Sequence, residues 1–573
     1  MTDRVDYLLR GTLVKVTTGN LVERPVAVRN DEIVALEERP AERELEAAYI
    51  APGLIDAHMH VESSMVTLPR YGRAVVPEGV TAIIYDPHEV ANVLGEDGVR
   101  AMLRDGRHTP LKARCTVPSS VPASHLQDGG ATVDTGTVGQ LLDEPDVAAL
   151  GEVMNIPGLL AGDEGIHDKI QAARERGLTV DGHMPQVRGS DLQEVARYLD
   201  NDHESTELAE AREKVEAGVR VYLREGTCSR DLSALLGLAD EVDSRRLSLC
   251  TDDRSVADLV EVGGIDSVVR LAIAGGVDPV EAVQMATINT AEAYGLPFGR
   301  VAPGAPAHLV LLSDLRSWDV EHVMIDGVLD PTTDVEEPPP TAIATDTVTF
   351  DPVEAADLTI GHDGPGPVTV RVVDAVGTLQ TARMRAEVPV LQGAGSPRDR
   401  PVLGPNRDED VLHMAVIERH GGDGGIGRGF VHGMEMERGA VAATVAHDAH
   451  NCVVVGADFE AMARAANHIR DIEGGLVAYD PRADGDADGE GDDNGFTALA
   501  LPVAGLMRDA PLAEVKARHE AVTERARALG VDRDGWATTL SFLALEVIPE
   551  YRLTNNGLVD VEAFDYVDVV VGN

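Results

Sequence analysis

Short apolar runs alternate with helical stretches through the middle of this 573-residue chain. Such alternation predicts repeated β-α units. Eight runs are present, the sixth of them very short and assigned from its place in the series. Eight units predict an α/β fold with a TIM-type (β/α)8 barrel, whose functional side chains lie at the carboxyl ends of the strands. The predicted strand ends lie near His60, Asp86, Val117, Glu152, His183, His203, Arg224 and Asp252.

Both flanks of this region have shorter strands, rich in β-branched residues and separated by turns. Three runs begin at Leu13, Val26 and Glu32, and a similar alternation returns at 307–312 and 323–327. Two β segments around a long middle predict one small β-sandwich built from both flanks. We therefore expect the sandwich at 1–50 and 300–335 and the barrel at 51–299.

A proline-rich run at 335–341 separates the last part of the chain. It cannot continue a helix or a sheet, so it is interpreted as a linker. Strands and helices follow it, which predicts a C-terminal α+β domain over 346–573. Within that domain, the acidic run at 484–494 lacks the regular ligand pattern of a calcium loop and predicts a solvated loop.

The composition is strongly acidic, with 98 Asp and Glu against 49 Lys and Arg and a formal net charge of -49. A field of that sign repels nucleic acid and anionic membranes, so we expect neither as a partner. The acidity is spread along the chain and resembles that of proteins from salt-loving, halophilic microbes. Four cysteines without C-x-x-C spacing, no signal peptide and no long apolar segment predict reduced thiols and a cytoplasmic protein.

Polar side chains at five of the strand ends could form a metal site. A strand points two residues separated by one position to the same side, which applies to the first histidine pair. Four imidazoles and two carboxylates at one barrel mouth suit two divalent cations a few ångströms apart. Each residue alone could be structural, but all six together favour metal binding. The six are His58, His60, Glu152, His183, His203 and Asp252.

Ten short motifs resemble the amidohydrolase superfamily and, within it, the adenine deaminase family. The first contains Asp-Ala-His-Met-His and the seventh is Cys-Thr-Asp-Asp-Arg. Together they extend over nearly the whole chain, so the resemblance includes the C-terminal domain. The motifs lie at 52–64, 86–95, 151–155, 181–183, 202–204, 224–226, 250–254, 419–422, 445–451 and 540–549.

The resemblance implies a hydrolase that converts adenine and water to hypoxanthine and ammonia in purine salvage. It also implies two divalent cations, manganese first, with iron or zinc as alternatives. The implied ligands are His58, His60 and Asp252 for one ion, His183 and His203 for the other, and Glu152 between them. Asp252 is implied as the proton shuttle for the attacking water.

Further residues are expected to contact the substrate. His88 and Glu89 follow the second strand and are candidates for contacting and protonating the ring; a helix start with a solvated Glu89 is the alternative. Glu62 stands where amidohydrolases that act on carboxylated rings often carry arginine, which favours a neutral nitrogen heterocycle. Glu62 could instead stabilise the following helix. Ser63 and Asp86 complete the predicted substrate-binding set.

Other interpretations stay open. The chain could be an amidohydrolase for another aminopurine derivative or a cyclic amide, or a noncatalytic metal-binding scaffold. His447 and His450, beside Asp448, could bind another metal if they were helical, although a structural or domain-contact role is favoured. The expected partners are a small-molecule purine and a second copy of the chain in a homodimer.

Overall fold

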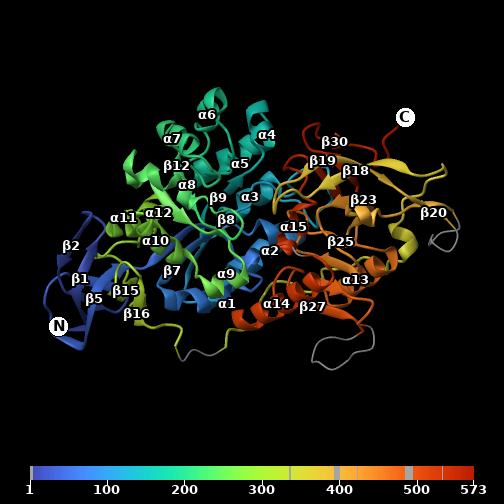
Figure 1. Cartoon of the computed structure of the whole chain (residues 1–573). Coiled ribbons are helices and arrows are strands. Elements are labelled where there is room, and N and C mark those ends of the chain that lie inside the picture. Colours follow the sequence, from blue (N-terminus) through green and yellow to red (C-terminus); the bar gives the residue numbers. More distant parts are fainter. Residues whose placement is uncertain are drawn as a thin grey trace. The chain divides into compact units, whose positions relative to one another are not determined.

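The computed structural model describes residues 4–333, 337–392, 400–422, 424–483, 494–531, 533 and 535–572, so the acidic run at 484–494 lies almost wholly outside the described residues. The chain forms two compact units (Figure 1). The first contains Met1–Pro87, Arg100–Ser120 and Val133–Ala342. The second contains His88–Val99, Val121–Thr132 and Ile343–Asn573. Two short segments that the sequence interpretation assigned to the barrel are therefore part of the second unit.

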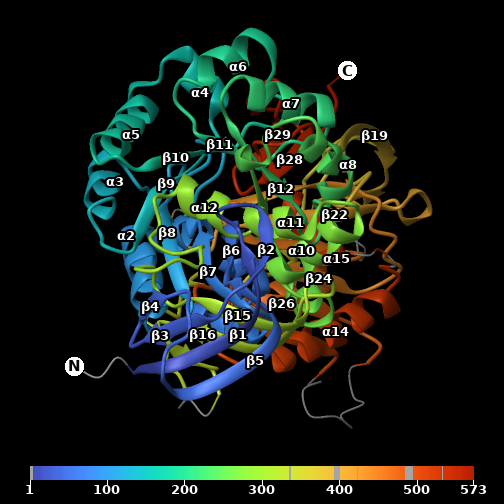
Figure 2. The same ribbon diagram turned by 90° about the vertical axis from the view of Figure 1, so that its left-hand side faces the viewer.

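Eight parallel strands of the first unit, β6 to β13, form the barrel (Figure 2). One sheet has the order β10-β9-β8-β7-β6-β14, and another has the order β11-β12-β13. Strand β14 follows β13 after one residue and returns to pair with β6. Between β10 and β11, the backbone N–H of Asp200 donates to the carbonyl of Val180. The predicted (β/α)8 barrel is thus confirmed. The strands are β6 (Leu54–His60), β7 (Val80–Tyr85), β8 (Lys112–Val117), β9 (Val147–Val153), β10 (Thr179–Gly182), β11 (Asn201–Asp202), β12 (Arg220–Arg224), β13 (Leu247–Cys250) and β14 (Asp252–Asp253).

Some of the helices after these strands begin at a side-chain cap, which orders the start of the helix. Asn155 accepts a hydrogen bond from the N–H of Gly158 at the start of α4, and Ser255 accepts one from Asp258 at the start of α9. The helices are α1 (Leu68–Val75), α2 (His88–Asp105), α3 (Thr135–Leu141), α4 (Ile156–Ala161), α5 (Glu164–Glu175), α6 (Gly189–Val195), α7 (Leu208–Glu216), α8 (Leu232–Leu235), α9 (Val256–Glu261), α10 (Ile265–Ala274), α11 (Pro279–Met285) and α12 (Ile288–Ala293).

Strands from both flanks of the barrel join in one eight-stranded sheet of the first unit (Figure 1). Its order is β17-β16-β15-β5-β1-β3-β4, with β2 paired to β1. Alternate apolar residues such as Leu9, Leu13, Leu309 and Leu311 are fully buried in its core. The strands are β1 (Val5–Lys15), β2 (Asn20–Glu23), β3 (Val26–Arg29), β4 (Glu32–Ala35), β5 (Ala41–Pro52), β15 (Leu309–Asp314), β16 (Asp319–Ile325) and β17 (Val328–Leu329).

The second unit contains an eight-stranded sheet of order β19-β18-β23-β22-β25-β24-β26-β27. All its neighbouring strands are antiparallel except β18 and β23. Strands β20 and β21 pair with each other, and β28, β29 and β30 form a small sheet. The strands are β18 (Val368–Asp374), β19 (Ala382–Val388), β20 (Val390–Leu391), β21 (Val402–Leu403), β22 (Val411–Ile417), β23 (Ile426–His432), β24 (Ala440–Ala443), β25 (Cys452–Gly456), β26 (Gly475–Tyr479), β27 (Phe496–Ala500), β28 (Tyr551–Thr554), β29 (Gly557–Asp560) and β30 (Asp565–Tyr566).

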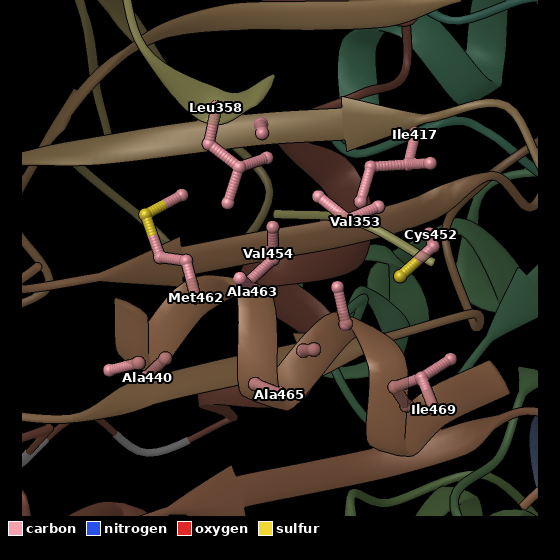
Figure 3. Close-up of a cluster of buried hydrophobic side chains, with 14 of the residues drawn as sticks. Val353, Leu358, Ile417, Ala440, Cys452, Val454, Met462, Ala463, Ala465 and Ile469 are labelled. Atoms are coloured by element: carbon pink, nitrogen blue, oxygen red, sulfur yellow. The ribbon is translucent and has the colours of Figure 1, made fainter. Parts of the chain in front are cut away.

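Three helices complete the second unit: α13 (Phe459–Asp471), α14 (Leu512–Ala528) and α15 (Trp536–Phe542). The core of the unit lies where α13 packs on the sheet (Figure 3). Ala465 and Ile469 are one helical turn apart and wholly buried, facing sheet residues such as Val454. Small alanines let the helix approach the strands closely, so α13 packs against β24 and β25, the strands on either side of one loop.

Candidate metal centre

The first pair of candidate ligands lies on β6. His58 and His60 point to the same side, with their Nε2 atoms 3.2 Å apart. The Nδ1 atom of His60 lies 3.0 Å from the backbone carbonyl oxygen of Asp86. Because a carbonyl only accepts hydrogen bonds, Nδ1 carries the ring proton and Nε2 keeps a lone pair. His60 is therefore prepared to bind a cation through Nε2.

Glu152, near the end of β9, lies between two pairs of imidazoles. Its Oε1 atom lies 3.4 Å from Nε2 of His60 and 3.9 Å from Nε2 of His58. Its Oε2 atom lies 2.6 Å from Nδ1 of His183 and 3.4 Å from Nε2 of His203. Each carboxylate oxygen thus faces a different pair of nitrogens, as the oxygens of a bridging ligand would.

Asp252 lies where β14 begins and has a left-handed backbone conformation, with φ of 54°. Its Oδ1 atom lies 3.1 Å from Nε2 of His60 and 3.7 Å from Nε2 of His58. Its Oδ2 atom accepts a hydrogen bond of 2.9 Å from Nη1 of Arg224. The arginine therefore orients Asp252 so that Oδ1 faces the imidazoles.

These six residues, which we call the barrel centre, have the spacing and chemistry of a site for divalent cations. Ligand atoms about 2.1 Å from a cation lie about 3.0–3.4 Å from each other. In the barrel centre, the distances between facing donor atoms are 2.6–3.9 Å. Imidazole nitrogens and carboxylate oxygens suit manganese, iron and zinc. The residues present therefore fit the predicted metal group.

Both carboxylates of the barrel centre are held in the ionised form. Burial alone would raise the pKa of Glu152, but the hydrogen bonds and charges of His183 and His203 outweigh it and lower that pKa well below its usual range. Burial likewise opposes ionisation of Asp252, yet its contact with His60 and the charge of Arg224 lower its pKa well below the usual range. Ionised carboxylates are the form that binds a cation.

Two basic residues that had no role in the sequence analysis support this centre. Arg224, at the end of β12, bonds Asp231 and Glu204 besides Asp252. Lys214 on α7 is wholly buried, and its Nζ donates to Asp202 at 2.8 Å and to the Met184 carbonyl at 2.6 Å. Met184 follows one candidate histidine and Asp202 precedes another. The scarcity of lysine, which occurs at five positions, could have drawn attention to Lys214.

Three predicted substrate-binding residues lie in the first unit, close in sequence or in space to the barrel centre. Glu62 and Ser63 are in the 3-10 turn η1 (Val61–Ser64), which directly follows β6, and Glu62 is buried. The hydroxyl of Ser63 donates to Asp253. Asp86 follows β7, and its Oδ2 accepts a 3.0 Å hydrogen bond from the N–H of Glu152. Their contact with a substrate stays a prediction.

The predicted catalytic pair has different surroundings. His88 and Glu89 are the first residues of α2 and belong to the second unit. There Glu89 meets His447 and His450, which lie in the loop between β24 and β25. The proposed role of the pair in catalysis stays a prediction. The sequence pattern allows a metal site at His447 and His450 only if the two residues are helical, and this loop is not a helix.

The described part of the chain contains no helix that is both long and apolar enough to cross a membrane.

Two family models match the chain. The model of the amidohydrolase family matches residues 49–329, which include the whole barrel centre. Fold and site thus define the class of protein as an amidohydrolase, a family that implies a divalent metal at such a group of residues. The model of the adenine deaminase C-terminal domain matches residues 379–565.

Similarity to curated relatives extends over nearly the full length. Adenine deaminase of Desulfatibacillum aliphaticivorans is 39% identical over 98% of this chain and 97% of that protein. Adenine deaminase of Archaeoglobus fulgidus is 38% identical over 99% of this chain and 96% of that protein. The chain belongs to the adenine deaminase family. Among solved structures, N-acetyl-D-glucosamine-6-phosphate deacetylase from Mycobacterium smegmatis is 20% identical and overlaps 56% of this chain and 99% of its own, with a TM-score of 0.43.

Proposed function

We propose that this chain is an adenine aminohydrolase, which converts adenine and water to hypoxanthine and ammonia for purine salvage. The observation that carries the proposal is the likeness to adenine deaminase over 98% of the chain. All six candidate ligands are present and close together, which supports a working hydrolase over a noncatalytic scaffold. In the reaction, the water oxygen bonds to C6 of the ring, and the C6–N bond to the amino group breaks.

We further propose that the barrel centre holds two divalent cations. His58, His60 and Asp252 would hold one, His183 and His203 the other, and Glu152 would bridge them. The separate facing of the two Glu152 oxygens supports this division. Bound cations would lower the pKa of a water molecule and so supply hydroxide at neutral pH. Manganese is proposed first, with iron and zinc as alternatives for the same donors.

Asp252 is proposed to take the proton from the attacking water and deliver it toward the leaving amino group. Its geometry supports this role because Arg224 occupies Oδ2 and leaves Oδ1 toward the imidazoles. An ionised carboxylate at that position can accept a proton, and a general base within hydrogen-bond reach contributes about 10²–10⁴-fold in rate.

The residues proposed to bind the purine favour a neutral ring. Glu62 is a buried carboxylate two positions after His60, and it can accept an N–H from the ring or the amino group. Ser63 and Asp86 are proposed beside it. His88 and Glu89 are proposed to contact and protonate the ring. This role requires the ring to reach the start of α2, where both residues lie.

The test is ammonia release by the purified, metal-loaded chain from adenine, other aminopurines and cyclic amides. Adenine is expected to be turned over fastest, with hypoxanthine as product. Activity confined to another aminopurine or to cyclic amides would replace adenine as the substrate. A loaded protein inert on every ring would support the scaffold interpretation.

Two finer proposals concern the state of the protein. We propose a homodimer in the cytoplasm, in line with the predictions from sequence. Light scattering of the purified chain should give twice the 60.8 kDa monomer mass. A mass of one chain at micromolar concentration would contradict the dimer.

A further inference from the structure

A second group of histidines and carboxylates lies in the second unit, which we call the C-terminal cluster. His88 and Glu89 come from the start of α2, and the other three residues come from the loop between β24 and β25. Four members are at most 6% exposed, and the side chain of His447 is 13% exposed. The cluster consists of His88, Glu89, His447, Asp448 and His450.

Four candidate ligand atoms of the cluster lie close to one another. Oε1 of Glu89 lies 2.6 Å from Nδ1 of His447 and 3.4 Å from Nε2 of His88. Oδ1 of Asp448 lies 3.9 Å from each of those two nitrogens. These distances bracket the roughly 3.0–3.4 Å expected between ligands of one cation. These four distances are therefore compatible with ligands of one cation.

His450 differs from the other two histidines in its hydrogen bonds. Its Nδ1 atom accepts a 3.1 Å hydrogen bond from the backbone N–H of Ala446. A neutral imidazole has one nitrogen with a lone pair and one with a proton, so the proton of His450 is on Nε2. This Nε2–H group donates to Oε2 of Glu89. His450 thus orients a carboxylate and is not itself able to bind a cation through Nε2.

The charges of the cluster call for a cation. Glu89 and Asp448 are buried carboxylates, and within the described residues their ion-pair partners are histidines alone, with no lysine or arginine. Oδ2 of Asp448 is buried and has no hydrogen-bond partner among the described residues. Burying a carboxylate without compensation is costly. One divalent cation would neutralise both carboxylates.

We propose that the C-terminal cluster binds one divalent transition-metal cation through His88 Nε2, Glu89 Oε1, His447 Nδ1 and Asp448 Oδ1, with His450 orienting Glu89. Two imidazoles and two carboxylates suit tetrahedral zinc. The cluster shares no residue with the barrel centre, and its proposed metal binding does not depend on the proposed adenine deamination. It also gives His88 and Glu89 a role other than the predicted ring contact, and metal content distinguishes the two roles.

The test is the zinc content of the full-length chain after removal of metals with a chelator, reloading with Zn²⁺ and desalting. His447→Ala and the nearly isosteric Asp448→Asn are each expected to bind one zinc per chain fewer than the unmodified protein. The matched control is His432→Ala, which removes another partly buried histidine of the second unit that pairs with an aspartate, Asp374. It is expected to bind as much zinc as the unmodified protein.

A second measurement keeps the proposal testable if a variant folds poorly. A chain with His183→Ala and His203→Ala should retain the zinc of the cluster, and adding Asp448→Asn should remove it. Equal zinc content in the unmodified chain and in well-folded Asp448→Asn would overturn the cluster site. Failure of the fully loaded chain to deaminate adenine would overturn the proposed function and leave the cluster site unaffected.

The role of His450 gives a finer test. As a hydrogen-bond donor to a ligand, it should affect affinity and not the number of sites. His450→Ala is expected to weaken zinc binding by about 10–100-fold while the stoichiometry at saturation is unchanged. Loss of a full equivalent at saturating zinc would show that His450 is a direct ligand, contrary to the assignment from its ring proton.

Discussion

The barrel centre and the C-terminal cluster use the same three kinds of side chain in different hydrogen-bond settings. In the barrel centre, a backbone carbonyl accepts from Nδ1 of His60, so the lone pair is on Nε2, which faces the other candidate ligands. In the cluster, a backbone N–H donates to Nδ1 of His450 and leaves the proton on Nε2. The polarity of one backbone group thus decides whether a histidine can be a ligand. Residue type and spacing in the sequence do not contain this information.

The buried carboxylates of the two sites differ in a second way. Arg224 reaches Asp252 in the barrel centre, and Lys214 reaches Asp202 next to a candidate ligand. Glu89 and Asp448 pair with histidines alone among the described residues. The barrel centre therefore has part of its charge balanced by the protein. In the cluster, the proposed cation would balance the charge of the carboxylates.

The largest effect is expected from Glu152→Gln. Both nitrogen pairs then lose the carboxylate that they share, so kcat for adenine should fall by more than about 10⁴-fold, above the range typical of one acid or base. Steady-state ammonia release with metal analysis measures it.

Glu89→Gln is the matched change in the cluster. If Glu89→Gln loses one zinc but keeps substantial turnover, Glu89 is a zinc ligand. If Glu89→Gln loses turnover but keeps all its zinc, Glu89 is the acid that protonates the ring.

Asp252→Asn separates proton transfer from metal binding. We expect kcat to fall by about 10²–10⁴-fold while substantial metal stays bound, because an amide keeps the shape of the side chain but cannot accept the proton. The readout is turnover and metal content on one preparation. Near-normal turnover would refute the proton-shuttle role.

Lys214→Met tests how much the barrel unit depends on its buried cation. Removing it leaves Asp202 and Glu210 buried without their partner, which should lower the free energy of unfolding by about 3–5 kcal/mol. Denaturant unfolding measures it. Lys516→Met is the control, since it removes an i,i+4 pair with Glu520 near the surface and should cost about 0.5 kcal/mol or less. Equal costs would contradict the special role of Lys214.

Arg224→Lys tests the orientation of Asp252. A lysine cannot hold Asp252 and Asp231 together in the way a guanidinium does, so kcat/KM should fall by about 10–100-fold. The control is Arg174→Lys, which alters a partly exposed pair with Asp200 and should leave kcat/KM unchanged. An unchanged kcat/KM in Arg224→Lys would mean that Asp252 is oriented by its backbone alone.

The smallest effect concerns a histidine of the second unit that pairs with no carboxylate among the described residues. His413 is buried between Phe430 and Phe459, and burial lowers its pKa to about 3. Its folded pKa is below the unfolded value of about 6.5, so its stabilising contribution is full above pH 6.5 and is lost as the pH falls toward 3. Stability should fall by about 1 kcal/mol between pH 6.5 and 5.5. The free energy of unfolding of His413→Leu, measured with denaturant, should fall less steeply over this pH interval. The same pH dependence in the variant and the unmodified chain would contradict the prediction.

Much of the barrel could be predicted because each strand is a local pattern. The strand ends expected near His60, Glu152 and Asp252 are at or within two residues of the observed ends of β6, β9 and β13. Such runs are buried on both faces and bounded by turns, so few neighbouring residues suffice to find them. The fold class followed from their number.

The rest depends on contacts between distant parts of the chain. Arg224 was visible at a strand end, but only the fold brings it to Asp252, 28 positions away. His450 and Glu89 are separated by 361 positions, and neither local spacing nor periodicity relates them. The ring proton of His450 depends on one backbone N–H in a non-helical loop. Neighbouring site residues could be predicted from sequence where regular strands bring them together. They could not be predicted where an irregular loop brings them together.

The second unit is assembled from three separate pieces of chain, and this has a consequence for biosynthesis. The segment Val121–Thr132 meets residues near the other end of the polypeptide: Asn555 donates to Asp128, and the hydroxyl of Tyr566 donates to the carbonyl of Leu126. During translation, this early segment therefore lacks these two hydrogen-bond partners until more than four hundred further residues have been added. Ribosome stalling or premature termination before residue 555 would release a product that exposes it to chaperones and proteases.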